Sequence, residues 1–287
     1  MNDVRKVPAS AGAEWLLGGF RLLRQAPLGL GSLGAVYGVI ALLVPWSKGI
    51  NMTLFLLLEL LLMVLGPLLI GGMVYAARSV DGGGNAVPGQ LLQGVRDGKT
   101  ARLLATLVPQ VVAVLLCALL LVLMIGSDGL AQMAQTIERL QGQATPDPAL
   151  VSALPLGRLT LWMLLVLVIG VVTSFFTFAA VPELMFTDSA AVDAMRRSFR
   201  ACMRNLPALI VFMVLTMIAV VAIYTAVMMI ALVVKMVAGE QAMQIIAQLL
   251  ATAILMPVLT GAMYHAWKQM LAVDGAIVSP TVSGFEA

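Results

Sequence analysis

Long apolar stretches alternate with short polar segments along the whole chain. A helix needs about 20 mostly apolar residues to cross the hydrocarbon core of a bilayer, which is ~30 Å thick. Six stretches meet this requirement, and we expect each to form a membrane span: residues 28–46, 52–77, 103–125, 159–181, 207–234 and 241–267. The pattern therefore predicts an all-α fold, a polytopic membrane bundle of six transmembrane helices.

The lengths of the connections predict how the spans pair. Only a few residues join the first two spans and the last two, so each pair is expected to be a tight antiparallel hairpin. The outer loop at 126–158 is longer and holds a mildly polar helical stretch at 130–141. We expect a single membrane domain with an N-terminal segment at 1–27, hairpins at 28–80, 90–188 and 192–272, and a cytoplasmic tail at 273–287.

The distribution of lysine and arginine predicts the orientation of this bundle. Cytoplasmic loops of membrane proteins carry an excess of both residues. Only Lys48, Arg139, Arg158 and Lys235 fall on one side of the predicted spans, and the other 13 of the 17 basic residues fall on the opposite side. We therefore expect that side, with both termini, to be cytoplasmic.

The composition supports a membrane environment. Hydrophobic residues make up 61% of the chain and charged residues 11%, whereas about a quarter of a soluble domain is charged. The net charge of +3 is small and predicts no nucleic-acid partner. Cys117 and Cys202 lie at different predicted depths, so we expect neither a disulfide nor a zinc or iron–sulfur site. The opening residues hold no apolar stretch of signal-peptide type, so the first span is expected to be retained.

The chain also contains an internal repeat, in which a basic amphipathic segment precedes each hairpin. Residues 19–21 correspond to 198–200 and, more weakly, to 94–96. The ends of the first and third hairpins match as well, at 67–73 and 257–263. Parallel copies of this kind imply a pseudo-axis along the membrane normal. The alternative is chance similarity between apolar sequences.

Two of the basic segments, 14–25 and 192–204, carry apolar residues on one helical face and arginines on the other. Helices of this type lie at the headgroup level of a membrane, where each arginine gains about 1 kcal/mol from anionic lipid. Simple anchoring without a specific ligand is the plainer interpretation, and specific binding of lipid or of a partner is the alternative. The candidate contacts with anionic headgroups at the cytoplasmic face are Arg21, Arg24, Arg196, Arg197, Arg200 and Arg204.

Glu59 is the most unusual residue within the spans. A carboxylate inside a membrane is costly, and such residues usually face the bundle interior and a polar partner. Gln244, Gln248 and Thr252 share one face of the sixth predicted span at a similar depth. We therefore predict an intramembrane polar site formed by Glu59 with these three residues. Interhelical hydrogen bonding without transport is the plainer interpretation.

Four other residues receive simpler interpretations. His265 is the only histidine, which excludes a histidine-based metal cluster, and we expect it at the membrane interface. Glu183 lies near the inner end of the fourth predicted span, within reach of water, and is a weaker candidate than Glu59. Gly34 and Gly38 favour close helix packing, either inside the monomer or in a dimer.

The N-terminal region carries a distinctive run of motifs, namely Arg5-Lys6-Val7-Pro8-Ala9-Ser10, then Trp15-Leu16, Gly19-Phe20-Arg21-Leu22 with Arg24, and Pro27-Leu28. This run resembles the start of a family of uncharacterised multipass inner-membrane proteins of Gram-negative bacteria. The resemblance implies a location in the bacterial inner membrane. It implies no catalytic or binding residues.

The residues thus favour a protein that acts through lipid or protein contacts. We find no cluster of histidine, aspartate and serine of the kind an enzyme needs, so we expect no enzymatic activity and no cofactor. The alternative is a transporter or channel for a small or lipidic solute, supported by the repeat and by Glu59. The protein partner and the oligomeric state are left open.

Overall fold

The computed structural model describes residues 4–141 and 154–271, and every regular element in that part of the chain is a helix. The chain divides into two compact units, Met1–Leu107 with Phe176–Ala287, and Val108–Phe175. The predicted tail at 273–287 and most of the loop that follows residue 141 lie outside the described residues. The single membrane domain stays a prediction.

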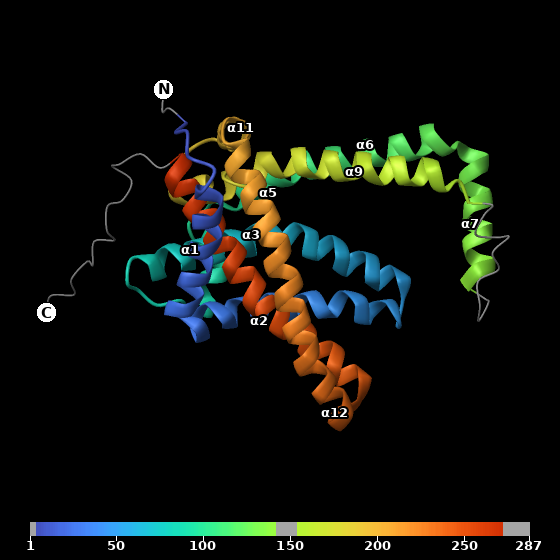
Figure 1. Ribbon diagram of the computed structural model, residues 1–287, viewed down its shortest axis with the longest axis horizontal. Coiled ribbons are helices and arrows are strands. Elements are labelled where there is room, and N and C mark those ends of the chain that lie inside the picture. The colour runs from blue at the N-terminus through green and yellow to red at the C-terminus, as the bar shows by residue number, and fades with distance from the viewer. Residues whose placement is uncertain (1–3, 142–153, 272–287) are drawn as a thin grey trace, which may run out of the picture. The chain divides into compact units, whose positions relative to one another are not determined.

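The first unit holds most of the helices (Figure 1). Two long helices pair as a hairpin, and α1 precedes them. A series of short helices follows, and the unit ends with α10, α11 and the long α12. Their bounds are α1 Ala11–Gln25, α2 Pro27–Lys48, α3 Met52–Asp81, η1 Pro88–Leu92, α4 Gln93–Arg96, α5 Thr100–Leu104, η2 Ala105–Leu107, α10 Ala180–Phe186, α11 Ala191–Arg204 and α12 Leu206–Met270.

Five helical segments in the described residues are long and apolar enough to cross a membrane: Pro27–Lys48, Met52–Asp81, Thr100–Ile125, Leu156–Phe186 and Leu206–Met270. The chain is therefore a helical protein of the multi-pass membrane type. The fifth segment covers both the fifth and the sixth predicted spans. The six-span count itself stays a prediction.

Helix α12 is interrupted at Gly239, where φ is 86° and ψ is 179°. Residues with a Cβ rarely adopt these backbone angles, so glycine permits the break. Figure 1 shows α12 running away from α11 and then folding back toward α1. A salt bridge of 2.5 Å between Lys235 and Glu240 lies across the break. The element thus consists of two helical arms.

Helix α1 packs against both arms of α12 through glycine contacts. A Cβ on Gly12 would lie 2.0 Å from the Ala208 carbonyl oxygen, and one on Gly19 would lie 2.1 Å from that of Val258. Between them Trp15 is fully buried, with its ring 6.1 Å from that of Phe212. The apolar face of α1 was expected to meet lipid, but it meets α12, because small residues let the two backbones approach closely.

Helix α2 packs on the second arm of α12 in the same manner. A Cβ on Gly34 would lie 2.4 Å from the Thr252 carbonyl oxygen, and one on Gly38 would lie 2.1 Å from the Thr252 hydroxyl. The interpretation of this glycine pair as a close contact within the monomer is confirmed.

The second unit consists of α6 (Val108–Ile125), α7 (Ser127–Gln141) and most of α9 (Leu156–Thr177). Helices α6 and α9 lie side by side (Figure 1). The Trp162 indole donates to the Cys117 carbonyl oxygen at 2.9 Å, and the Arg158 guanidinium donates to the Met124 carbonyl oxygen at 3.3 Å. Gly126, with φ of 79°, then turns the chain, and α7 runs crosswise at the end of this hairpin. The predicted helix at 130–141 is confirmed.

Candidate functional site

A buried carboxylate organises the first unit near the end of α12. Glu183 lies in α10 and is only 1% exposed. Its Oε1 accepts a hydrogen bond from the Arg197 guanidinium at 2.5 Å, and its Oε2 accepts one from the Trp267 indole at 2.6 Å. The Ser189 hydroxyl donates to Oε1 at 3.4 Å. A charge removed from water needs this degree of pairing, because an unpaired buried ion costs several kcal/mol.

The local sequence brings these groups together. Ala179 and Ala180, at the start of α10, are fully buried, so that α11 can approach closely. The Ala179 backbone N–H donates to the Ser198 hydroxyl of α11 at 3.0 Å. Arg197, the residue before Ser198, is thereby directed at Glu183, and its side chain is 23% exposed. Arg197 thus differs from the other arginines assigned to lipid, because its charge is neutralised inside the protein.

A second ion pair lies where α3 and α12 end. Asp81 accepts hydrogen bonds from the Lys268 ammonium at 2.7 Å and from the Tyr264 hydroxyl at 2.9 Å. The ring of Phe186, in α10, lies between these two elements. Its centroid is 6.0 Å from the Tyr264 ring, and the Arg78 guanidinium lies 4.6 Å from it, a cation–π distance. The ends of α3, α10 and α12 therefore meet in one polar and aromatic cluster.

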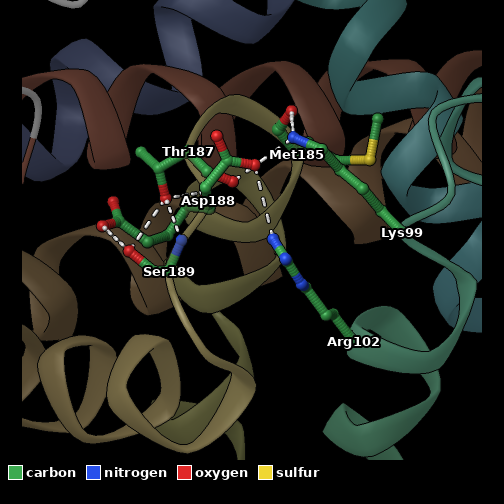
Figure 2. A network of polar contacts seen from close by, with 7 residues as sticks. Lys99, Arg102, Met185, Thr187, Asp188 and Ser189 are labelled. Carbon is green, nitrogen blue, oxygen red and sulfur yellow. Dashed lines mark hydrogen bonds and ion pairs between the residues drawn. The ribbon is translucent and has the colours of Figure 1, made fainter.

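The segment that follows α10 is held by basic residues from the short helices (Figure 2). The Lys99 ammonium donates to the carbonyl oxygens of Met185 at 2.8 Å and Thr187 at 3.3 Å. These carbonyls lie at the negative end of α10, where a cation is favoured. Burial lowers the pKa of Lys99, although nearby aspartates oppose that shift. Arg102 pairs with Asp188 at 3.5 Å, but Asp188 is 95% exposed, so this ion pair contributes little stability.

Glu59 lies in α3, and the other residues of the predicted intramembrane site lie in the second arm of α12. Thr252 lies against Gly38, and its hydroxyl donates to the Gln248 carbonyl oxygen at 2.8 Å. Gln248 is half-buried, whereas Gln244 and Glu59 are exposed. No hydrogen bond between Glu59 and these residues is present in the described part of the chain. Their pairing stays a prediction.

The remaining arginines assigned to lipid share one property. All are exposed, and none forms a salt bridge within residues 4–141 and 154–271. They are Arg21 and Arg24 on α1, and Arg196, Arg200 and Arg204 on α11.

The role of Glu183 could not be predicted from its neighbours in the chain. Its partners Arg197 and Trp267 lie 14 and 84 residues away, and its position near a span end suggested contact with water. One local feature could have indicated burial of Glu183, namely that this acidic residue lies in an apolar stretch, between Val181 and Leu184. The ring of His265 lies against Gly18 of α1, and its predicted place at the membrane interface stays a prediction.

The cluster holds matched charges, with Glu183 paired to Arg197 and Asp81 paired to Lys268. Each Glu183 oxygen already accepts a hydrogen bond from a donor in the protein, so this carboxylate is not a free base. Among the described residues, no group of three or more His, Cys, Asp or Glu side chains could hold a metal ion. The arrangement is suited to fixing α10, α11 and α12 together.

Comparisons with known proteins found no relative of this chain. No protein-family model matches this chain, no curated protein is similar to it, and no solved structure is similar to it.

Proposed function

We propose that this chain is a bacterial inner-membrane protein with six spans and both termini in the cytoplasm, and that it acts through contacts with anionic lipid headgroups. In this proposal the spans form three parallel hairpins, each preceded by a basic segment. The protein is not an enzyme, and its activity consists of what its cytoplasmic surface binds.

The contacts within the first unit support the three-hairpin arrangement. The end of each proposed hairpin packs on the basic segment that begins the next one. A Cβ on Gly72 of α3 would lie 2.3 Å from the Leu91 carbonyl oxygen, just before the segment at 94–96. Ser198 contacts Ala179 before α10, and Gly19 contacts Val258 of α12. The contact between α1 and α12 supports a repeated plan in which the end of the third hairpin meets the start of the first.

The observation that carries the lipid proposal is that the arginines of α11 differ in their surroundings, one facing the protein and three facing outward. Arg197 turns inward and neutralises Glu183. Arg196, Arg200 and Arg204 are spaced four residues apart, so they follow one side of the helix, and all three are exposed without a salt bridge in the described residues. Three unmatched charges on one helical face attract an anionic surface, with about 1 kcal/mol for each arginine.

The test replaces Arg196, Arg200 and Arg204 by glutamine in the full-length chain. Binding of phosphatidylglycerol to the purified protein is then titrated by native mass spectrometry, with phosphatidylethanolamine as the neutral comparison. We expect affinity for phosphatidylglycerol to fall at least about tenfold, since each arginine contributes about 1 kcal/mol and tenfold corresponds to about 1.4 kcal/mol. Affinity for phosphatidylethanolamine should stay constant.

Two control variants make the result specific. Arg139→Gln removes an exposed arginine from α7, on the side expected to face away from the cytoplasm, and should leave binding unchanged. The triple lysine variant at positions 196, 200 and 204 keeps the charge and should retain most of the affinity. Binding of phosphatidylglycerol by the glutamine variant at the wild-type level would refute the proposal.

A further inference from the structure

Helix α7 is strongly amphipathic, and no other helix in the described residues buries its apolar face. At 100° per residue its apolar side chains fall within about 120° of the helix circumference. Gln132, Gln135, Thr136 and Arg139 occupy the opposite side. None of residues 127–140 is buried by the described part of the chain, and Ile137 is 40% exposed. The apolar face comprises Leu130, Met133, Ala134, Ile137 and Leu140.

The position of α7 indicates what covers this face. Gly126 is the only residue between it and α6, an 18-residue helix made almost entirely of apolar side chains. Helix α9 runs beside α6, and α7 lies crosswise at the end of the pair (Figure 1). If α6 and α9 cross the bilayer, as proposed above, a helix crosswise to them at their end lies parallel to the membrane surface.

The charge of α7 distinguishes it from the basic helices. Its charged residues are Asp128, Glu138 and Arg139, so it carries one more negative than positive charge. Attraction to anionic lipid therefore cannot hold it at a membrane. Burial of the apolar face is sufficient, because binding of such helices scales with the apolar area inserted, about 5–10 Å into the headgroup boundary.

We propose that α7 is an interfacial helix that inserts Leu130, Met133, Ile137 and Leu140 into the outer leaflet, where it binds lipid of any headgroup charge. It anchors the outer end of the α6–α9 hairpin at the membrane surface. The occupant of the apolar face is thus the lipid interface, and not a second protein.

The experiment places an environment-sensitive fluorophore on either side of α7 in the full-length chain. Cys117→Ala removes the thiol in α6, while Cys202 is retained because it is buried. NBD is attached through Ile137→Cys on the apolar face or Gln135→Cys on the polar face. Both proteins are reconstituted in phosphatidylcholine vesicles with and without lipids that carry a nitroxide near the headgroup. The Cys117→Ala protein without added cysteine measures background labelling.

We expect blue-shifted emission at position 137 and quenching by the nitroxide lipids at least roughly twice that at position 135, because only the apolar face lies inside the headgroup boundary. Replacing a fifth of the lipid by phosphatidylglycerol should not alter either value. Equal, water-like emission at both positions would overturn the proposal. So would a shielded label at position 137 that the nitroxide lipids do not quench, since protein would then cover this face.

This result is separable from the placement of the spans. Quenching at position 137 reports on α7 alone. The same fluorophore at Leu116→Cys in α6, quenched by phosphatidylcholine with a nitroxide deep in its acyl chain, reports on the spanning helix. Deep quenching at 116 without quenching at 137 removes the interfacial helix and keeps the membrane span.

Discussion

Helices α11 and α7 are both amphipathic, but different materials are inferred to cover their apolar faces. On α11 the middle of the apolar side is buried against protein, with Ala194, Ala201 and Cys202 fully covered, and arginines line the outside. On α7 the apolar side is open and the polar side is nearly neutral. An amphipathic pattern therefore identifies a face that must be covered. The neighbouring elements and the charge indicate whether protein or lipid covers it.

Thiol chemistry should give the largest contrast between the two helices. Burial raises the pKa of Cys202 from 9.0 to about 12. Its thiolate fraction at pH 8 is therefore about three orders of magnitude lower than that of a free thiol, since each pH unit is a factor of ten. We expect alkylation of Cys202 by a membrane-permeant maleimide only after unfolding, and rapid alkylation of Ile137→Cys. Labelling of both thiols at similar rates in the folded protein would show that the α11 face is not buried.

The next effect concerns the inward arginine of α11. Glu183→Ala leaves the partly buried Arg197 without its partner, which should lower the free energy of unfolding by about 3 kcal/mol. Asp188→Ala breaks the exposed ion pair with Arg102 and should cost less than about 1 kcal/mol. Thermal unfolding in detergent measures both. Equal losses for the two variants would mean that Glu183 is not the residue that fixes α11.

Packing of α1 against α12 gives a smaller effect. Gly19→Ala places a Cβ 2.1 Å from the Val258 carbonyl oxygen, so one backbone must move. Overpacking of this kind costs about 1–3 kcal/mol. Gly170→Ala, in α9, is the matched control because a Cβ there meets no atom within 4 Å, and it should cause no loss. If Gly19→Ala is as stable as the control, the apolar face of α1 does not rest on α12.

Added salt should have the smallest effect, weakening lipid binding by the arginines of α11 but not insertion of the apolar face of α7. The Debye length falls from about 10 Å at 0.1 M salt to about 3 Å at 1 M. Phosphatidylglycerol binding through Arg196, Arg200 and Arg204 should therefore weaken several-fold over that range in a native mass spectrometry or fluorescence titration. Quenching of a label at position 137 should stay constant. A parallel loss of both signals would assign α7 to electrostatic binding.

The sequence was sufficient for features that depend on local pattern. Apolar length located the long helices, helical periodicity located α7, and the spacing of Gly34 and Gly38 indicated a close contact. It could not provide the partner of a face. The apolar face of α1 has the same sequence pattern whether lipid or α12 covers it. Only the glycines at positions 12 and 19 favour the closer protein contact.

The buried cluster was also beyond local pattern. Arg197 belongs to the same stretch of arginines as Arg196 and Arg200, and only the tertiary fold turns it toward Glu183. Trp267 reaches the same carboxylate from another helix. Such a site depends on contacts between distant segments, so a single sequence contains no periodic signal for it.

In the proposed topology the chain crosses the bilayer six times, and α12 contributes two spans that meet at Gly239. The most direct measurement fuses a dual reporter, alkaline phosphatase or green fluorescent protein, after residue 239 in one truncated chain and after Ala287 in the full-length chain. We expect phosphatase activity at the first site, outside the cytoplasm, and fluorescence at the second site, inside it. The same reporter signal at both sites, or phosphatase activity after Ala287, would contradict it.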